Sequence, residues 1–132
     1  VYGLDKNNKL VIDTLTGQQA IDRGVRDAVT FGPALVVNGR AVASGGGLNP
    51  RTAIGQRADG SILLLVIEGR QTNSLGATYS DLANIMLDFG AVNAANLDGG
   101  MSSSMVYEGN EISTNDSNSG VRDIPTAFLI MP

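Results

Sequence analysis

The chain has 132 residues, of which 42% are hydrophobic, and it carries a formal net charge of −4 at pH 7. This length suits one domain with one core and is too short for two. The nine basic residues form no basic stripe, so a nucleic-acid partner is not expected. No apolar run reaches the roughly 20 residues that span a bilayer, so membrane insertion is not expected either.

The chain contains no cysteine and no histidine. A thiol nucleophile, a disulfide, a zinc site built on Cys or His, and a Ser-His-Asp triad within this chain are therefore excluded. Acid–base chemistry must come from Asp, Glu, Lys or Tyr, or from residues outside the chain. The sequence begins at Val1 rather than Met, which suggests a mature or cut end.

The first third of the chain is predicted to form short strands and one short helix. Residues 9–13 read as a strand, and residues 16–23 read as a helix that Gly24 ends. Residues 34–37 and 40–43 flank an Asn-Gly pair, which is a strong signal for a β-hairpin.

The middle of the chain contains a second hairpin pattern and the clearest helix. Residues 52–57 and 62–67 flank an Asp-Gly turn, and residues 62–67 are continuously apolar, which predicts a strand covered on both faces. Residues 78–89 form the helix, with Thr78 and Asp81 as its capping box. Its predicted buried face consists of Leu82, Ile85, Met86 and Phe89.

Three further strands are predicted after this helix. Residues 92–97 read as a buried strand, residues 103–107 as a short strand, and residues 125–131 as a final strand. Many strands and one good helix indicate an α+β domain, with a mixed or largely antiparallel sheet and the main helix packed on one face.

Asp98-Gly99-Gly100 is the most informative segment. A buried strand ends in a carboxylate, and the two glycines let a ligand approach the backbone closely. Successive N–H groups in such a turn can form an anion-binding nest, and Ser102 and Ser103 add hydroxyl groups. An ordinary Asp-Gly turn is the structural alternative.

Two arginines and a polar loop are further candidates. Arg51 stands at the mouth of a predicted strand, where an arginine can hold phosphate or carboxylate bidentately, although a solvated arginine beside a loop is the more frequent case. Asp116 and Arg122 lie in or beside a polar loop that precedes the last strand, a plausible rim of an active site. If both arginines hold one phosphate, their guanidinium groups should converge on a cleft that also contains Gly99 and Gly100.

Taken together, these segments resemble the phosphodiester glycosidase family over nearly the whole chain from Phe31 onward. The family's usual third glycine is replaced here by Met101. Family domains also extend further upstream, so residues 1–132 are expected to be a single domain that is the C-terminal part of a larger one lacking its upstream strands. The matching segments are residues 31–36, 51–55, 59–60, 76–78 and 93–100, with Ser102, Ser103, Asp116 and Arg122.

The resemblance implies hydrolysis of a sugar-1-phosphodiester, which releases a sugar such as N-acetylglucosamine from a phosphorylated glycan or cell-envelope polymer. It implies a bacterial secreted or cell-envelope protein that acts on exopolysaccharide-like material. Asp98 is then the expected nucleophile or base. The expected substrate-binding residues are Arg51, Gly99, Gly100, Ser102, Ser103, Asp116 and Arg122.

Two other interpretations stay open at this stage. The chain could be a non-catalytic glycan-binding module, although three Tyr, three Phe and no Trp offer few stacking surfaces. It could also be a structural fragment that completes another chain, with the missing N-terminal part of the domain as its partner. A divalent cation stays open too, because Asp98 and Asp116 are oxygen ligands of the kind calcium or magnesium binds.

Overall fold

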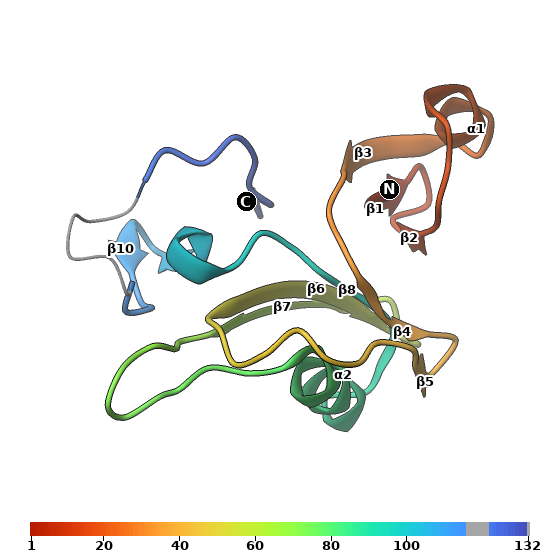
Figure 1. Ribbon diagram of the computed structural model, residues 1–132. Coiled ribbons are helices and arrows are strands. Elements are labelled where there is room, and N and C mark those ends of the chain that lie inside the picture. Colours follow the sequence, from red (N-terminus) through yellow and green to blue (C-terminus); the bar gives the residue numbers. More distant parts are fainter. Residues whose placement is uncertain (116–121, 132) are drawn as a thin grey trace.

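The computed structural model describes residues 1–115 and 122–131, and its centre is a five-stranded antiparallel sheet (Figure 1). The strand order is β5-β4-β8-β6-β7, so β8 runs between β4 and β6. Helix α2 (Tyr79–Asp88) covers one face of this sheet, as the α+β prediction requires. The strands are β4 (Ala34–Val37), β5 (Arg40–Ala41), β6 (Arg51–Arg57), β7 (Ile62–Ile67) and β8 (Ala91–Asn96).

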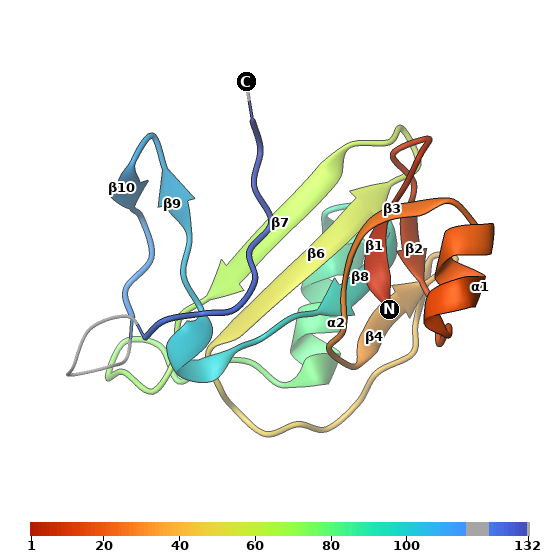
Figure 2. The same cartoon turned by 90° about the horizontal axis from the view of Figure 1, so that it is seen from above.

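The opposite face carries a smaller sheet of order β2-β1-β3 (Figures 1 and 2). A buried glutamine joins the two sheets: Gln56 Oε1 on β6 accepts the Leu10 N–H at 2.8 Å, and its Nε2 donates to the Asn8 carbonyl at 2.7 Å. Strand β2 and helix α1 were predicted, whereas β1 and β3 were not. The elements are β1 (Tyr2–Asp5), β2 (Leu10–Ile12), α1 (Gly17–Asp22) and β3 (Val25–Val29).

Small side chains allow α2 to pack closely on the central sheet. Gly55 on β6 faces Met86, and a Cβ atom at Gly55 would lie 3.2 Å from the Met86 sulfur. Phe89 was predicted to be buried and is 62% exposed, because it caps the end of α2 before Gly90 reverses the chain. The buried core consists of Leu35, Val36, Ala53, Leu82, Ala83, Met86, Ala91 and Ala94.

The sequence prediction for β7 is wrong for one face. Leu63, Leu65 and Ile67 pack against the core on the helix side, but Ile62 and Leu64 on the other side are 36% and 37% exposed. Strand β7 ends the sheet in the described part of the chain, and its Leu64 face lines a cavity instead of a packed layer.

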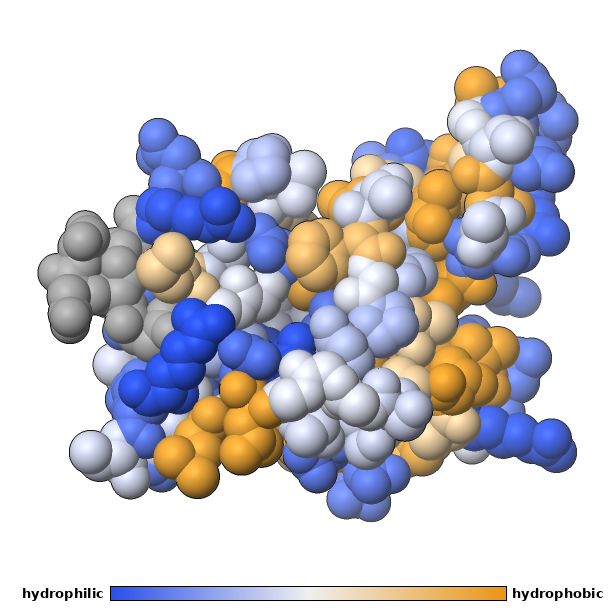
Figure 3. Space-filling view, in the orientation of Figure 1, coloured by the Kyte–Doolittle hydropathy of each residue, from blue (hydrophilic) through white to orange (hydrophobic). Residues whose placement is uncertain are grey.

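The C-terminal region is less regular than predicted. A short 3₁₀ helix, η1 (Gly100–Ser102), follows β8. The strand expected over residues 103–107 is reduced to β9 (Val106–Tyr107), which pairs with β10 (Asn110–Glu111). The expected strand at residues 125–131 is wrong: this segment has no strand pairing among the described residues. Leu129, Ile130 and Met131 are 78%, 80% and 77% exposed. On the face in Figure 3, hydrophobic residues gather in separate patches between hydrophilic ones.

Helix α2 begins with a complete capping box. Thr78 Oγ1 accepts the Asp81 N–H at 3.1 Å, and Asp81 Oδ2 accepts the Thr78 N–H at 2.9 Å. The hydrogen bonds from Thr78 lower the pKa of Asp81 below its ordinary value of 3.8. A lowered carboxyl pKa stabilises the fold above pH 3.8, and this contribution is lost as the pH falls through the lower folded value.

Replacing Thr78 with alanine removes the hydroxyl acceptor at the start of α2. We expect the free energy of unfolding to fall by about 1 kcal/mol at neutral pH. Urea denaturation followed by circular dichroism would measure this change. Thr14→Ala is the control, because Thr14 is exposed and lies outside any helix. Equal stabilities of the two variants would show that the cap contributes nothing.

Candidate functional site

Asp98 lies just beyond the end of the central strand β8, and the backbone on either side of it is held in place. The Leu97 N–H donates to the Thr52 carbonyl on β6 at 2.8 Å. Asn96 is 1% exposed, and its Nδ2 donates to the carbonyls of Gly32 and Leu97 at 2.7 and 2.9 Å. The carboxylate therefore projects from a fixed strand end rather than from a loose turn.

The two glycines after Asp98 bring the chain against the segment that leads into β6. The Gly100 N–H donates to the Pro50 carbonyl at 2.9 Å, and Gly100 has a φ of +59°. A Cβ atom on Gly99 would lie 2.8 Å from the same carbonyl oxygen. Such an approach is too close for any residue with a side chain, so glycine is required at position 99.

Three backbone N–H groups at and after these glycines donate within the protein, so the anion nest expected here stays a prediction. The Gly100 N–H is occupied by Pro50, and the N–H groups of Ser102 and Ser103 donate to the carbonyls of Gly99 and Gly100 at 3.1 and 3.0 Å. These three donors stabilise η1 and its junction with β6. They do not point to an anion in this conformation.

Arg122 and Asp98 form the charged centre of the site. Arg122 Nη2 donates to Asp98 Oδ2 at 2.8 Å, and Arg122 Nε donates to Ser102 Oγ at 2.7 Å. The side chains of Arg122 and Asp98 are 53% and 37% exposed. An ion pair this exposed adds only about 0–1 kcal/mol to stability. The main effect of the pair is on geometry, because it holds a carboxylate, a guanidinium and a hydroxyl group in a fixed arrangement.

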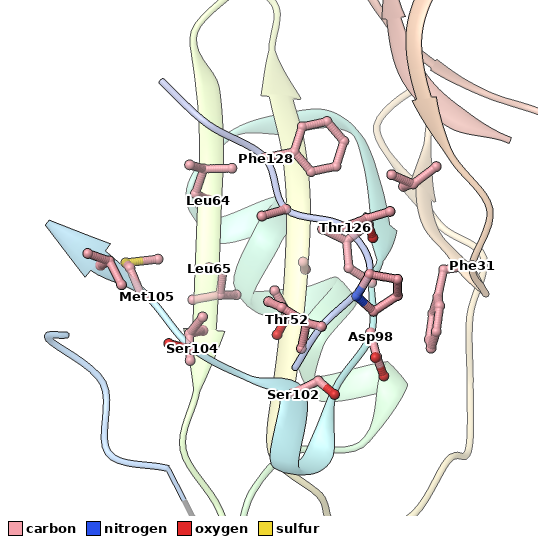
Figure 4. Close-up of a pocket in the computed structure, with 18 of the residues that line it drawn as sticks. Phe31, Thr52, Leu64, Leu65, Asp98, Ser102, Ser104, Met105, Thr126 and Phe128 are labelled. Carbon is pink, nitrogen blue, oxygen red and sulfur yellow. The ribbon is translucent and has the colours of Figure 1, made fainter. Parts of the chain in front are cut away.

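A cavity of about 170 Å³ opens beside this pair, on the face of the sheet opposite α2. Figure 4 shows Asp98 and Ser102 at one end, with Leu64 and Phe128 toward the other. The buried Thr52 hydroxyl lies in the wall and has no hydrogen-bond partner in the described part of the chain. Polar atoms at one end and an apolar wall are a common composition for a small-molecule site. Its labelled lining residues are Phe31, Thr52, Leu64, Leu65, Asp98, Ser102, Ser104, Met105, Thr126 and Phe128.

Arg51 lies elsewhere, and the expectation that it converges with Arg122 is wrong. Its side chain is on the helix face of β6, because Thr52, the next residue, faces the cavity and neighbouring strand residues point to opposite faces. Its Nε donates to the Ala77 carbonyl at 3.0 Å, and its guanidinium carbon lies 4.1 Å from the centre of the Tyr79 ring.

The buried Arg51 also holds the glycine loop that precedes β6. Its Nη2 donates to the carbonyls of Gly46 and Gly47, and Arg51 as a whole is only 6% exposed. The structure therefore gives Arg51 a positioning contact with the loop that leads to Pro50. Direct substrate binding by Arg51 stays a prediction.

Other predicted site residues have mixed placements. Ser103 is 3% exposed, and its hydroxyl has no partner within residues 1–115 and 122–131. Asp116 lies outside the described residues.

The described residues contain no group of three or more His, Cys, Asp or Glu side chains that could hold a metal ion. None of their helices is long and apolar enough to cross a membrane.

Sequence reasoning missed a second arginine beside the glycine turn. A Cβ atom on Gly100 would lie 3.5 Å from Arg70 Nη2, and the same nitrogen donates to Asn49 Oδ1 at 2.9 Å. Arg70 therefore lies next to Gly100, the neighbourhood in which Arg51 was expected. The feature of the sequence that could have indicated this is that Arg70 follows Gly69, three residues after the end of β7.

An α+β domain with an aspartate at a central strand end, an arginine paired to it and an adjoining cavity has the architecture of a small-molecule hydrolase or binding domain. The chain belongs to the phosphodiester glycosidase family, whose profile matches residues 1–131.

Two curated relatives are similar to the chain over part of their length. The SPbeta prophage-derived protein YomE of Bacillus subtilis is 36% identical over 119 residues, covering 85% of this chain and 17% of that protein. The N-acetylglucosamine-1-phosphodiester α-N-acetylglucosaminidase of Bos taurus is 39% identical over 62 residues, covering 47% of this chain and 12% of that protein. The chain thus spans less than a fifth of the length of either relative.

Solved structures share the fold. The zebrafish N-acetylglucosamine-1-phosphodiester α-N-acetylglucosaminidase catalytic domain superposes with a TM-score of 0.75 at 22% identity, over 96% of this chain and 48% of that one. A candidate exported protein of Burkholderia pseudomallei superposes with a TM-score of 0.55 at 45% identity, over 57% of this chain and 15% of that one. The 132 residues correspond to about half of the zebrafish chain.

Gly99→Ala tests the close contact that positions Asp98. The new methyl group would meet the Pro50 carbonyl oxygen at 2.8 Å, so one of the two segments must move. We expect a loss of about 1–3 kcal/mol in the free energy of unfolding, measured by urea denaturation. Gly17→Ala is the matched control, because no atom lies within 4 Å of the position that its new methyl group would take. A Gly99→Ala protein as stable as the control would contradict the contact.

Proposed function

We propose that the domain hydrolyses a sugar-1-phosphodiester, with Asp98 and Arg122 at the centre of the site. The observation that carries the proposal is their ion pair at one end of the cavity, with Ser102 bound to the same arginine. Membership of the phosphodiester glycosidase family supports the reaction class. The substrate we propose is a phosphorylated glycan or cell-envelope polymer that carries a sugar such as N-acetylglucosamine on phosphate.

In the proposed reaction, the bond between the anomeric carbon and the phosphate oxygen breaks. The phosphate monoester leaves with the bonding electron pair, and water supplies the new hydroxyl group of the sugar. A phosphate monoester is a good leaving group, so the demand on a general acid is small. The main cost is positive charge at the sugar, which a nearby carboxylate offsets.

Asp98 can meet that demand in either of two ways. As a nucleophile it would form a glycosyl ester that water then hydrolyses, which retains the anomeric configuration. As a base it would take a proton from the attacking water, which inverts the configuration. Proton NMR of the first-formed sugar anomer distinguishes the two.

Arg122 is proposed to hold the phosphate. This role is supported by the hydrogen bonds from Nη2 to Asp98 and from Nε to Ser102, because both partners line the cavity. A guanidinium can offer two parallel hydrogen bonds to a phosphate, which fixes orientation as well as charge. Negative charge that develops on the leaving group is then stabilised where it appears.

An extracellular or cell-envelope location is part of the proposal. It is supported by the likeness to the candidate exported protein of Burkholderia pseudomallei. A polymeric phosphoglycan outside the cytoplasm would be accessible to an enzyme in that location.

Asp98→Asn should abolish most sugar release in the complete domain. Asparagine keeps the size of the side chain but carries no negative charge, so we expect kcat to fall about a hundredfold or more. Release of sugar from a sugar-1-phosphodiester gives the rate, and Asp88→Asn, an exposed change at the end of α2, is the control. Near-normal turnover would reduce Asp98 to a turn residue. Sugar binding without turnover in the unaltered domain would instead support a glycan-binding module.

Arg122→Lys should weaken substrate binding more than it slows chemistry. Lysine keeps the positive charge and loses the planar fork, so we expect KM to rise roughly tenfold, equivalent to about 1.4 kcal/mol. Steady-state kinetics separates KM from kcat. Arg23→Lys is the matched control, because Arg23 forms an exposed ion pair with Asp13 outside the cavity. An unchanged KM would remove Arg122 from the phosphate site.

A further inference from the structure

Strand β7 (Ile62–Ile67) has one free edge among the described residues. It pairs only with β6, through six successive residue pairs in regular antiparallel register. Backbone N–H and C=O groups along the other edge therefore lack a strand partner in residues 1–115 and 122–131. A row of such groups is a template for pairing with another strand.

The sequence of β7 does nothing to block that pairing. All six residues are apolar, and the strand contains no charge, no proline and no bulge. Exposed edges in natural proteins usually carry one of these features. The opposite edge of the same sheet shows the contrast, because β5 has only two residues and one of them is Arg40.

The exposed side chains of β7 point to the same conclusion. Leu64 is 37% exposed although it lies in the middle of the strand, and it forms part of the cavity wall with Val66. Met105 and Phe128 complete the apolar wall on that side. A neighbouring strand beside β7 would place its own apolar side chains next to Leu64 on the same face and extend the wall of the cavity.

We propose that the free edge of β7 binds a β-strand from the remainder of the same domain, with apolar side chains on the face that Leu64 and Val66 share. The zebrafish catalytic domain supports this choice of occupant, because these residues match only 48% of that chain at a TM-score of 0.75. The other half of that fold is long enough to supply a strand. The inference rests on the sheet and not on the proposed hydrolysis.

Hydrogen exchange in the complete domain tests the pairing. In an edge strand alternate N–H groups point away from the sheet and exchange quickly, whereas a strand paired on both sides protects them all. We expect every amide of residues 62–67 to exchange within about tenfold of its partner in β6. Fast exchange at alternate positions of β7 would overturn the proposal. The measurement needs no substrate, so its outcome is separate from that of the activity assays.

A lysine substitution gives a second readout in the same complete domain. Leu64→Lys should lower the melting temperature by roughly 4 °C or more, because the charge would lie against the apolar side chains that the added strand places beside it on the same face. Val42→Lys, at a residue 56% exposed beside the opposite edge, should change it little. Equal effects of the two substitutions would contradict a strand paired with the edge of β7. Protection of β7 that is lost on dilution, together with a dimer in light scattering, would assign the edge to a second copy and also overturn the proposal.

Discussion

The contact between Gly99-Gly100 and the Pro50 carbonyl is the constraint on which the site depends. It joins the end of the central strand to the start of its neighbour, with Gly100 donating at 2.9 Å and no room for a side chain on Gly99. Asp98 immediately precedes this junction. Because β8 lies between β4 and β6, a shift at the junction would move the carboxylate relative to the whole sheet.

The buried Arg51 supports the same junction from the other face of the sheet. Its guanidinium joins the glycine loop, the start of α2 and the ring of Tyr79, and the loop continues directly into Pro50. A charge this deep is tolerated because its donors meet carbonyl oxygens and its plane lies over an aromatic ring. In this structure the arginine that looks like a substrate ligand in the sequence supports the glycine loop, and direct substrate binding by it stays a prediction.

Local patterns predicted the elements that depend on local forces. The main helix with its buried Leu82 and Met86, the capping box of Thr78 and Asp81, and the Asn-Gly hairpin all recur in the structure. Strand β3 was not predicted from the sequence. Its five residues include Arg26 and Asp27, which are exposed, so no apolar pattern indicates a strand there. Which face a strand residue uses depends on the strand's exact start, and for this reason Arg51 was placed on the wrong side.

The sequence predicted Asp98 as part of the candidate site but not its ion pair with Arg122 or the position of Arg70. Asp98 follows from a buried strand that ends in Asp-Gly-Gly, a pattern visible in one stretch of sequence. Its pairing with Arg122 joins residues 24 positions apart through the C-terminal segment, and no local rule gives such a contact. The proximity of Arg70 to Gly100 is likewise long-range, so only the assembled fold brings it to the turn.

The Asp98–Arg122 pair also bears on how a carboxylate could work beside a phosphate. Two negative groups within a few ångströms repel each other, and water screens that repulsion poorly once a ligand fills the cavity. An arginine between them interacts favourably with both, so in the proposed reaction Arg122 offsets the repulsion that phosphate binding brings to Asp98. The two side chains are 53% and 37% exposed, so their attraction is weak. In the proposed reaction the same contact would become stronger as substrate displaced water, at the point where the chemistry requires both charges in place.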